Sequence, residues 1–308
     1  MHYMKIRRGI KIVALAMVTA LSTAGCGDPD MNGTKSEPEP AGAAPYRILS
    51  IGASFTRDAM TYLPDMLIKN GAAGKDIVIV NAYIGGQTLK GHAVGAQYEL
   101  PTYERQSFGT GGAMTSAYGV KLIDIITSNY WDYISIQQGA DQAGNSTEYR
   151  DEDIEYLLGY IKDHCPNPGV KVIFHMTWAY AANTTQTVFN TVYGGDQMAM
   201  YNMIVETVQD KILPNKGFEF IIPSGTAVQN ARTVYGDTLN SDGYHLNDRG
   251  RFIAGAMWLR QIYGFNVDVF DSPYQALNGY TITLDDMAVI AQCAEDAFDH
   301  PFDVTDQL

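Results

Sequence analysis

The chain has 308 residues, 46% hydrophobic and 18% charged, which is long enough for one large domain with its own hydrophobic core. Its formal net charge is -13 at pH 7, and no cluster of Lys and Arg lies beyond the first dozen residues. Nucleic acids and bare anionic surfaces bind basic patches, so the composition argues against both as partners.

The N-terminal segment has the pattern of a secretory leader. Basic side chains up to Lys11 precede an apolar run over residues 12–21, and small residues then lead into Cys26. A Cys after small residues is similar to a bacterial lipobox, so we expect residues 1–25 to be a lipoprotein signal peptide and Cys26 to carry the lipid. The alternative is a transmembrane helix, but the apolar run is short for one. Residues 26–45 predict a flexible tether, and residues 46–308 a single domain.

Strands and helices are expected to alternate in the rest of the chain. Short apolar runs bounded by turn residues predict five strands, and apolar residues at helical spacing predict helices between and after them. We expect strands at residues 47–52, 76–82, 131–138, 170–176 and 218–222. We expect the main helices at residues 148–164, 247–263 and 284–298, and shorter ones near residues 63, 123, 200 and 224. Residues 91–118 show little periodicity and predict an irregular insertion.

Five strands separated by helices predict a parallel sheet covered on both faces, a three-layer α/β/α sandwich. Ligands of such sheets bind beyond the carboxyl ends of the strands. The residues that follow strands are therefore the candidates for a site: Ser54, Gly85, Gly86, Gln137, Gln138, Trp178 and residues 242–245.

Ser54 lies where the first strand turns into a helix. The first backbone N–H groups of a helix have no partner within the helix and carry partial positive charge, so a nucleophile there has an oxyanion donor in its own backbone. The alternative is that Ser54 only caps the helix.

Asp242 and His245 are three positions apart directly before a helix. At that spacing the carboxylate can hold the imidazole in one tautomer while the other ring nitrogen faces outward. A serine hydroxyl becomes a nucleophile when such a base takes its proton. The alternative is a surface loop before a capped helix.

Two further histidines and two further cysteines are not assigned to the chemistry of the site. His92 and His175 are expected to be buried or supporting residues rather than bases. Cys165 and Cys293 either form a disulfide or stay free, and their spacing does not decide between the two. The spacing of His and Cys gives no metal-ligand pattern, so no structural zinc is expected.

Four motifs follow one another along the chain: IGASF after the first strand, YIGGQTL after the second, ISIQQG after the third and DGYHL near the end. In this order the chain resembles the SGNH/GDSL hydrolase superfamily over residues 47–264. The residues of these four motifs are similar to those of an uncharacterised branch of the superfamily that is common among lipoproteins of glycan-degrading bacteria. The resemblance implies a flavodoxin-like fold with a five-stranded parallel sheet.

The resemblance also implies roles for these residues. Ser54 is the expected nucleophile, His245 the general base and Asp242 its orienting carboxylate. The oxyanion hole is expected from the backbone N–H groups of Ser54 and Gly86, with Gly85 in reserve, and from a side-chain amide. The superfamily has Asn after the third strand, where this chain has Gln137 and Gln138. The Gln-Gly pair is similar to that of carbohydrate acetylesterases, which implies Gln138 as the donor, with Gln137 in reserve.

The function implied is that of a serine esterase that removes acyl groups, acetyl foremost, from a carbohydrate. It implies an acylated glycan or other small ester as substrate, no metal or organic cofactor and no obligate protein partner. The N-terminal pattern predicts a lipid anchor at Cys26 in the bacterial cell envelope, with the protein either in the periplasm or exposed on the outer membrane. Trp178 and Tyr180 lie in an aromatic loop and belong either to a sugar-binding rim or to the core. The alternatives are a glycan-binding lipoprotein on an inactive hydrolase scaffold and a lipase or lysophospholipase.

Overall fold

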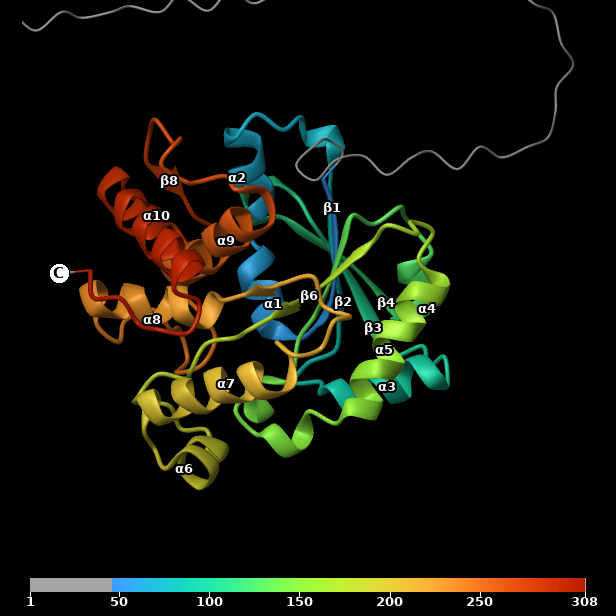
Figure 1. The fold of residues 1–308 in the computed structure, drawn as a ribbon. Coiled ribbons are helices and arrows are strands. Elements are labelled where there is room, and N and C mark those ends of the chain that lie inside the picture. Colours follow the sequence, from blue (N-terminus) through green and yellow to red (C-terminus); the bar gives the residue numbers. More distant parts are fainter. Residues whose placement is uncertain (1–45, 308) are drawn as a thin grey trace, which may run out of the picture. The chain divides into compact units, whose positions relative to one another are not determined.

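The computed structural model describes residues 46–307 (Figure 1). The expected signal peptide, the lipidation site Cys26 and the tether to residue 45 lie outside the described residues. None of the helices in the described range is long and apolar enough to cross a membrane.

The core of the fold is a seven-stranded sheet in the order β4-β3-β2-β1-β5-β6-β7. Five of these strands run parallel, as expected from the sequence. They are β1 (Tyr46–Gly52), β2 (Ile77–Tyr83), β5 (Tyr133–Ile136), β6 (Lys171–His175) and β7 (Ile221–Ile222). The strands in the middle of the sheet are almost wholly buried, which explains their continuous apolar runs. The predicted three-layer fold with a parallel sheet is confirmed.

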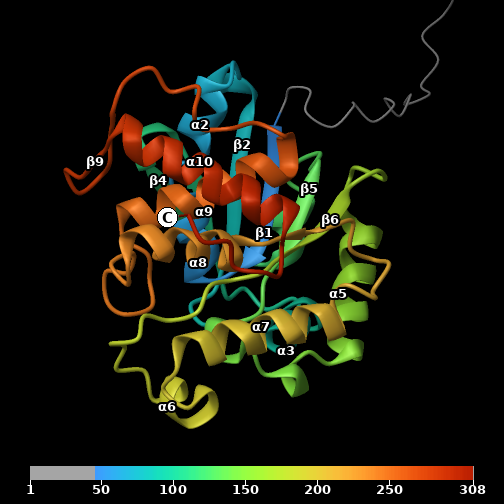
Figure 2. The ribbon, with the colours of Figure 1, turned by 60° about the vertical axis from the view of Figure 1, so that its left-hand side comes forward.

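Helices cover both faces of the sheet (Figures 1 and 2). One group packs around α9: α1 (Ser54–Met60), α2 (Leu63–Lys69), α8 (Ser224–Tyr235), α9 (Asp248–Tyr263) and α10 (Leu284–Asp299). The other group is α3 (Leu89–Gln97), α4 (Leu122–Ile126) and α5 (Asp151–His164). The connection from β6 to β7 carries α6 (Thr187–Tyr193) and α7 (Gln197–Lys211). A small hairpin, β8 (Tyr274–Gln275) and β9 (Thr281–Ile282), precedes α10.

Two expectations about these elements were wrong. Residues 91–118 are not an irregular insertion, because they hold most of α3 and the antiparallel strands β3 (Tyr103–Phe108) and β4 (Met114–Val120), which extend the sheet from five strands to seven. β4 is exposed over nearly its whole length, so its sequence lacks the apolar alternation of a half-buried strand. The fifth predicted strand, residues 218–222, is reduced to Ile221–Ile222.

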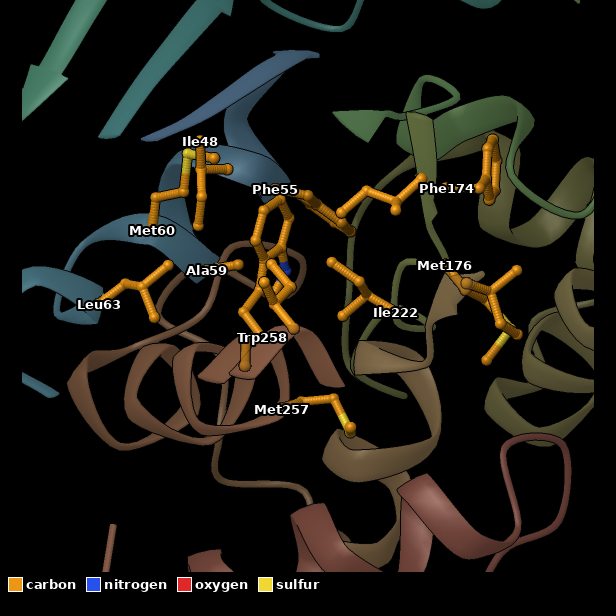
Figure 3. Close-up of a cluster of buried hydrophobic side chains, with 14 of the residues drawn as sticks. Ile48, Phe55, Ala59, Met60, Leu63, Phe174, Met176, Ile222, Met257 and Trp258 are labelled. Atoms are coloured by element: carbon orange, nitrogen blue, oxygen red, sulfur yellow. The ribbon is translucent and has the colours of Figure 1, made fainter. Parts of the chain in front are cut away.

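The helix that follows β1 is held by aromatic packing. Phe55 of α1 is fully buried and stacks on Trp178, with ring centroids 4.2 Å apart and ring planes at 9°. Figure 3 shows Phe55 in one cluster of buried side chains with Ile48 of β1 and Trp258 of α9. Burying a side chain of this size contributes about 2 kcal/mol to stability. This packing fixes the start of α1, and with it Ser54, at the carboxyl end of the sheet.

Candidate active site

A cleft of about 310 Å³ lies beyond the carboxyl ends of β1 and β2. Its lining residues come from the end of β2, from the loops that follow the strands, from the start of α1 and from the loop between α8 and α9. They are Ser54, Phe55, Arg57, Tyr83, Gly85, Gly86, Ala140, Asp141, Tyr180, Gln186, Tyr244 and His245. The cleft therefore brings together the predicted nucleophile, the predicted base and both candidate glycines, which are up to about 190 positions apart in the sequence.

Ser54 is the first residue of α1, and its neighbours leave backbone donors unpaired beside it. Ala53 occupies the N-cap and has no side chain that can cap the helix. Gln137 takes over that task, because its Oε1 accepts the Thr56 backbone N–H at 2.9 Å and also the Thr56 hydroxyl. Within residues 46–307, the N–H groups of Ser54 and Phe55 have no recorded partner. They are available to an oxyanion at Ser54.

His245 and Asp242 form the pair expected from their spacing. His245 Nδ1 lies 2.7 Å from Asp242 Oδ2, and the backbone N–H of His245 donates to Asp242 Oδ1 at 2.8 Å. Partial burial acts to raise the pKa of Asp242, but the hydrogen bonds from His245 and Tyr244 outweigh it and hold the pKa below its usual value. The carboxylate thus stays charged at mildly acidic pH. Because Nδ1 is engaged, Nε2 is the imidazole nitrogen left for proton transfer.

Aromatic rings fix the imidazole over the cleft. The ring centroids of Tyr244 and His245 lie 4.0 Å apart. The Phe55 ring is edge-on to the His245 ring, with their centroids 6.1 Å apart. Trp178 Nε1 donates to the Tyr244 carbonyl at 3.0 Å and so holds the loop that carries His245. Among the described residues no hydrogen bond joins Ser54 Oγ to His245, although both line the cleft. Such catalytic bonds often tighten only when substrate is present.

Gly86 lies at the cleft in a backbone conformation that favours glycine, with φ of +64°. Its loop rests directly on Gly139: a Cβ at position 139 would lie 2.8 Å from the Gln87 carbonyl oxygen and 2.9 Å from that of Gly86. Within residues 46–307, neither Gly85 nor Gly86 has a recorded partner for its N–H, so both can donate into the cleft. Gly86 thus remains the predicted second oxyanion donor, with Gly85 beside it.

The two glutamines have a different role from the one expected. Gln138 does not line the cleft: its Nε2 donates to the Glu148 carbonyl at 2.9 Å, and its Oε1 accepts the Leu89 N–H at 2.9 Å. Gln137 is equally buried, and its Nε2 donates to the Gln138 carbonyl at 3.1 Å. Both amides are turned into the protein, where one supports the start of α1 and the other the loop after β2. The site geometry therefore gives no support to a side-chain amide as third donor.

The aromatic loop after β6 belongs mainly to the core. Trp178 is fully buried, so its face is covered by Phe55 rather than open to a sugar. Tyr180 lines the cleft but is only 1% exposed. Its hydroxyl donates to Asp141 Oδ1, and burial followed by this carboxylate raises the Tyr180 pKa, so it remains a donor at any physiological pH. Of the two predicted substrate-binding residues, only Tyr180 reaches the cleft.

Several residues of the site were not predicted from the sequence. Asp58, fully buried on α1, accepts the Leu246 N–H at 2.9 Å and the Arg251 Nε at 2.9 Å, and so ties α1 to the loop that carries His245. Arg57 and Asp141 line the cleft. The sequence signal for Arg57 and Asp58 was their position three and four residues after Ser54, respectively, about one helical turn from it.

The other described histidines and cysteines do not line the cleft. His92 and His175 are buried, and burial lowers the pKa of each to about 3, so both are neutral supports as expected. Cys165 and Cys293 are both free thiols. Within residues 46–307, no three His, Cys, Asp or Glu side chains lie together as metal ligands would.

The fold and the cleft define a three-layer α/β/α protein with a serine, a histidine and an aspartate gathered at the carboxyl edge of a parallel sheet. The chain belongs to the family described as domain of unknown function DUF4886, whose model matches residues 47–294.

One solved structure of this family is similar to the chain over most of its length. A DUF4886 family protein from Bacteroides uniformis is 32% identical, with a TM-score of 0.76, and the match covers 85% of this chain and 98% of that one. An acetyl xylan esterase from Geobacillus stearothermophilus is more distant, at 18% identity and a TM-score of 0.40, over 71% of this chain and 95% of that one. Among proteins with curated descriptions, none matches this sequence.

Proposed function

We propose that this protein is a serine esterase that removes short acyl groups, such as acetyl, from a carbohydrate. The observation that carries the proposal is the single cleft in which Ser54, at a helix start with unpaired N–H groups, meets His245, whose Nδ1 lies 2.7 Å from Asp242. This is the set of groups that acyl transfer through a serine requires.

The proposed reaction has two halves. His245 Nε2 takes the proton of Ser54 Oγ, which attacks the ester carbonyl, and the N–H groups of Ser54 and Gly86 stabilise the resulting tetrahedral anion. His245 gives this proton to the sugar alkoxide, which leaves as an alcohol. A water molecule then gives a proton to His245 and attacks the acyl-enzyme, and His245 returns that proton to Ser54 Oγ as the acid is released.

The size and lining of the cleft support a small acyl group. At about 310 Å³ the cleft lies at the lower end of the range for small-molecule sites, and Arg57, Asp141 and His245 bring polar groups into it. A lipase or lysophospholipase needs a long apolar channel, which this lining does not supply. The glycan-binding alternative rested on the missing Asn after the third strand and on the aromatic-rich loops. The loop after β6 gives it no support, because Trp178 is buried.

The test compares residues 27–308 with the Ser54→Ala variant on 4-nitrophenyl acetate and on acetylated xylan. The Ser272→Ala variant, which changes an exposed serine, is the matched control. We expect the parent and the control to hydrolyse short esters and Ser54→Ala to lose nearly all activity. Equal rates for the parent and Ser54→Ala on every short ester would leave the binding scaffold as the better hypothesis, and faster hydrolysis of decanoyl than of acetyl esters would favour a lipase.

We also propose that the protein is anchored in the bacterial cell envelope through a lipid on Cys26. The basic and apolar N-terminal pattern before Cys26 is the motivation. The full chain is expected in the membrane fraction and the Cys26→Ala variant is not expected to be lipidated. Incorporation of a labelled fatty acid into the variant would contradict the proposal.

A further inference from the structure

Arg57 is placed where it can meet a substrate bound at Ser54. It lies three residues after Ser54 on α1, so the two side chains project from the same side of the helix, and both line the cleft. The Tyr83 ring, which also lines the cleft, lies 5.4 Å from the Arg57 guanidinium carbon. This contact with an aromatic face orients the guanidinium without neutralising it.

Within the described residues 46–307, Arg57 has no carboxylate partner, whereas most arginines of that range have one. Of the eight arginines within residues 46–307, six lie within 4.0 Å of a carboxylate oxygen, and only Arg57 and Arg105 do not. Arg105 instead donates to Ser107 Oγ at 2.7 Å, away from the cleft. Acidic side chains exceed basic ones by 13 in the whole sequence, so an unpaired guanidinium at the cleft marks a place for an anion.

The cleft also holds an acidic group that suits sugar hydroxyls. Asp141 accepts the Tyr180 hydroxyl through Oδ1, and in the described part of the chain no cation lies within 4.0 Å of it. A carboxylate in this setting can accept hydrogen bonds from the hydroxyl groups of a substrate. The cleft therefore offers one group for a substrate anion and another for hydroxyl groups.

From this arrangement we infer that Arg57 forms an anion subsite beside Ser54 and that the preferred ester carries a carboxylate. The planar guanidinium binds such a carboxylate through two parallel hydrogen bonds, while Asp141 binds hydroxyl groups of the same substrate. The substrate class is an acylated acidic sugar, such as an acetylated uronate. This inference rests on the proposed esterase function and adds the substrate class to it.

The test uses pairs of esters that differ only by a carboxylate. One pair is an acetylated methyl glucuronide and the matching acetylated methyl glucoside, which places the anion on the sugar. The other is 4-nitrophenyl hydrogen succinate and 4-nitrophenyl butyrate, which places it on the acyl group. With the full chain in mild detergent we expect kcat/KM to favour the anionic member of the sugar pair by about tenfold, the size of one charge-assisted hydrogen bond.

The Arg57→Gln variant is expected to bring that ratio close to one, and Arg57→Lys to keep part of it because the charge remains. Arg105→Gln removes the same charge away from the cleft and is expected to keep the ratio of the parent, with circular dichroism confirming that each variant is folded. A parent with no preference in either pair, or a preference that survives Arg57→Gln, overturns the inference. A preference only in the succinate pair would mean that the recognised carboxylate belongs to the acyl group, and it overturns the acidic-sugar assignment.

A binding measurement separates this inference from the esterase proposal. In the Ser54→Ala background, calorimetry compares methyl glucuronide with methyl glucoside, each with and without Arg57→Gln. Tighter binding of the glucuronide that is lost with Arg57→Gln supports the subsite even if no ester is hydrolysed. Equal affinity for the two sugars overturns the subsite even if the parent is an active esterase.

Discussion

The hydrogen bonds of Asp242 determine the tautomer of His245. Oδ1 accepts the backbone N–H groups of Tyr244 and His245, at 3.2 and 2.8 Å, while Oδ2 faces His245 Nδ1 at 2.7 Å. The two oxygens are thus not interchangeable, because the backbone fixes which of them faces the imidazole. Nε2 is then the basic nitrogen, as proton transfer from Ser54 requires.

Asp242→Asn is expected to lower kcat about ten-thousandfold with little change in KM. The amide oxygen will keep the two backbone bonds, so the amide NH₂ will face Nδ1 and force the proton onto Nε2, which then cannot act as a base. Steady-state kinetics on 4-nitrophenyl acetate measures the effect. The control is Asp271→Asn, at an exposed aspartate that pairs with Lys69. A loss of less than tenfold in Asp242→Asn would show that this carboxylate does not set the tautomer.

Gly139→Ala is expected to lower kcat about tenfold, because the new Cβ would press on the Gly86 and Gln87 carbonyl oxygens at 2.9 and 2.8 Å and displace the oxyanion loop. Gly159→Ala is the matched control, since a Cβ there has nothing within 4 Å and lies within α5. That control is expected to keep its activity and gain about 1 kcal/mol in stability. Full activity in Gly139→Ala would mean that the position of this loop does not limit the reaction.

At this scale the sequence identified Ser54, Asp242, His245 and Gly86 as neighbours, because each follows a strand or precedes a helix at the same sheet edge. It did not identify the direction in which Gln138 points. A residue that follows a strand can turn its side chain into the cleft or into the core, and this choice depends on partners such as the Glu148 carbonyl, which are distant in the sequence.

At the scale of elements, Asp58 connects the helix that carries Ser54 to the loop that carries His245. Burial raises the Asp58 pKa, while Arg251 and the Leu246 N–H act to lower it, so the carboxylate depends on these two partners. Leu246 directly follows His245. The link therefore couples the stability of the fold to the geometry of the site.

Arg251→Gln is expected to cost about 3 kcal/mol of unfolding free energy, because it leaves the buried Asp58 carboxylate without its cation. Asp58→Asn should cost less, since Arg251 keeps a second carboxylate, Asp248, at 3.6 Å. Urea denaturation at pH 7 measures both losses of unfolding free energy. The double variant should lose less than the sum of the losses in the two single variants. Lys69→Gln, which breaks an exposed pair with Asp271, is the control and should cost under about 1 kcal/mol. Additive losses with unchanged kcat would argue against the link.

The prediction of elements succeeded where burial imposes a pattern. The helix at residues 247–263 has its N-cap at Asn247, which accepts the Gly250 N–H at 3.1 Å, and ends at Tyr263 as expected. The hairpin of β3 and β4 was missed because most residues of β4 face solvent, and a strand without a buried face has no periodic signal. The sheet edge could therefore not be predicted from apolar spacing.

At the scale of the whole molecule, buried neutral histidines make the fold sensitive to acid. Burial lowers the pKa of His92 and His175 to about 3, against an ordinary value near 6.5. Between these values the unfolded chain binds protons that the folded chain does not, so stability falls as the pH falls from about 6.5 towards 3. Nearby groups are neutral: His92 contacts Tyr103, and His175 contacts Ser224 and Thr56.

As the pH falls from 7 to 4, each of these histidines is expected to lower the free energy of unfolding by about 3 kcal/mol. In His92→Gln the difference between the unfolding free energies at pH 7 and at pH 4 should shrink by about that amount, whatever the absolute stability of the variant. His300→Gln, at an exposed histidine, is the control. Urea denaturation at both pH values provides the numbers, and an unchanged difference in His92→Gln would show that His92 takes up a proton in the folded state.

The overall architecture was predictable because five buried strands separated by helices allow few arrangements. Their carboxyl ends locate the site before any side chain is considered, which is why Ser54 and His245 were expected at one edge. That Arg57 packs on the Tyr83 ring and has no carboxylate partner among residues 46–307 was not predictable, since it depends on side chains from several elements around it.

The most direct test of the account is whether Ser54 is the activated nucleophile. The full chain is incubated with a fluorophosphonate, which modifies serines that a base has activated, and the modified peptide is identified by mass spectrometry. We predict one adduct, on Ser54, that is lost in Ser54→Ala and strongly slowed in His245→Ala. An unmodified protein, or an adduct on another serine, would contradict the account.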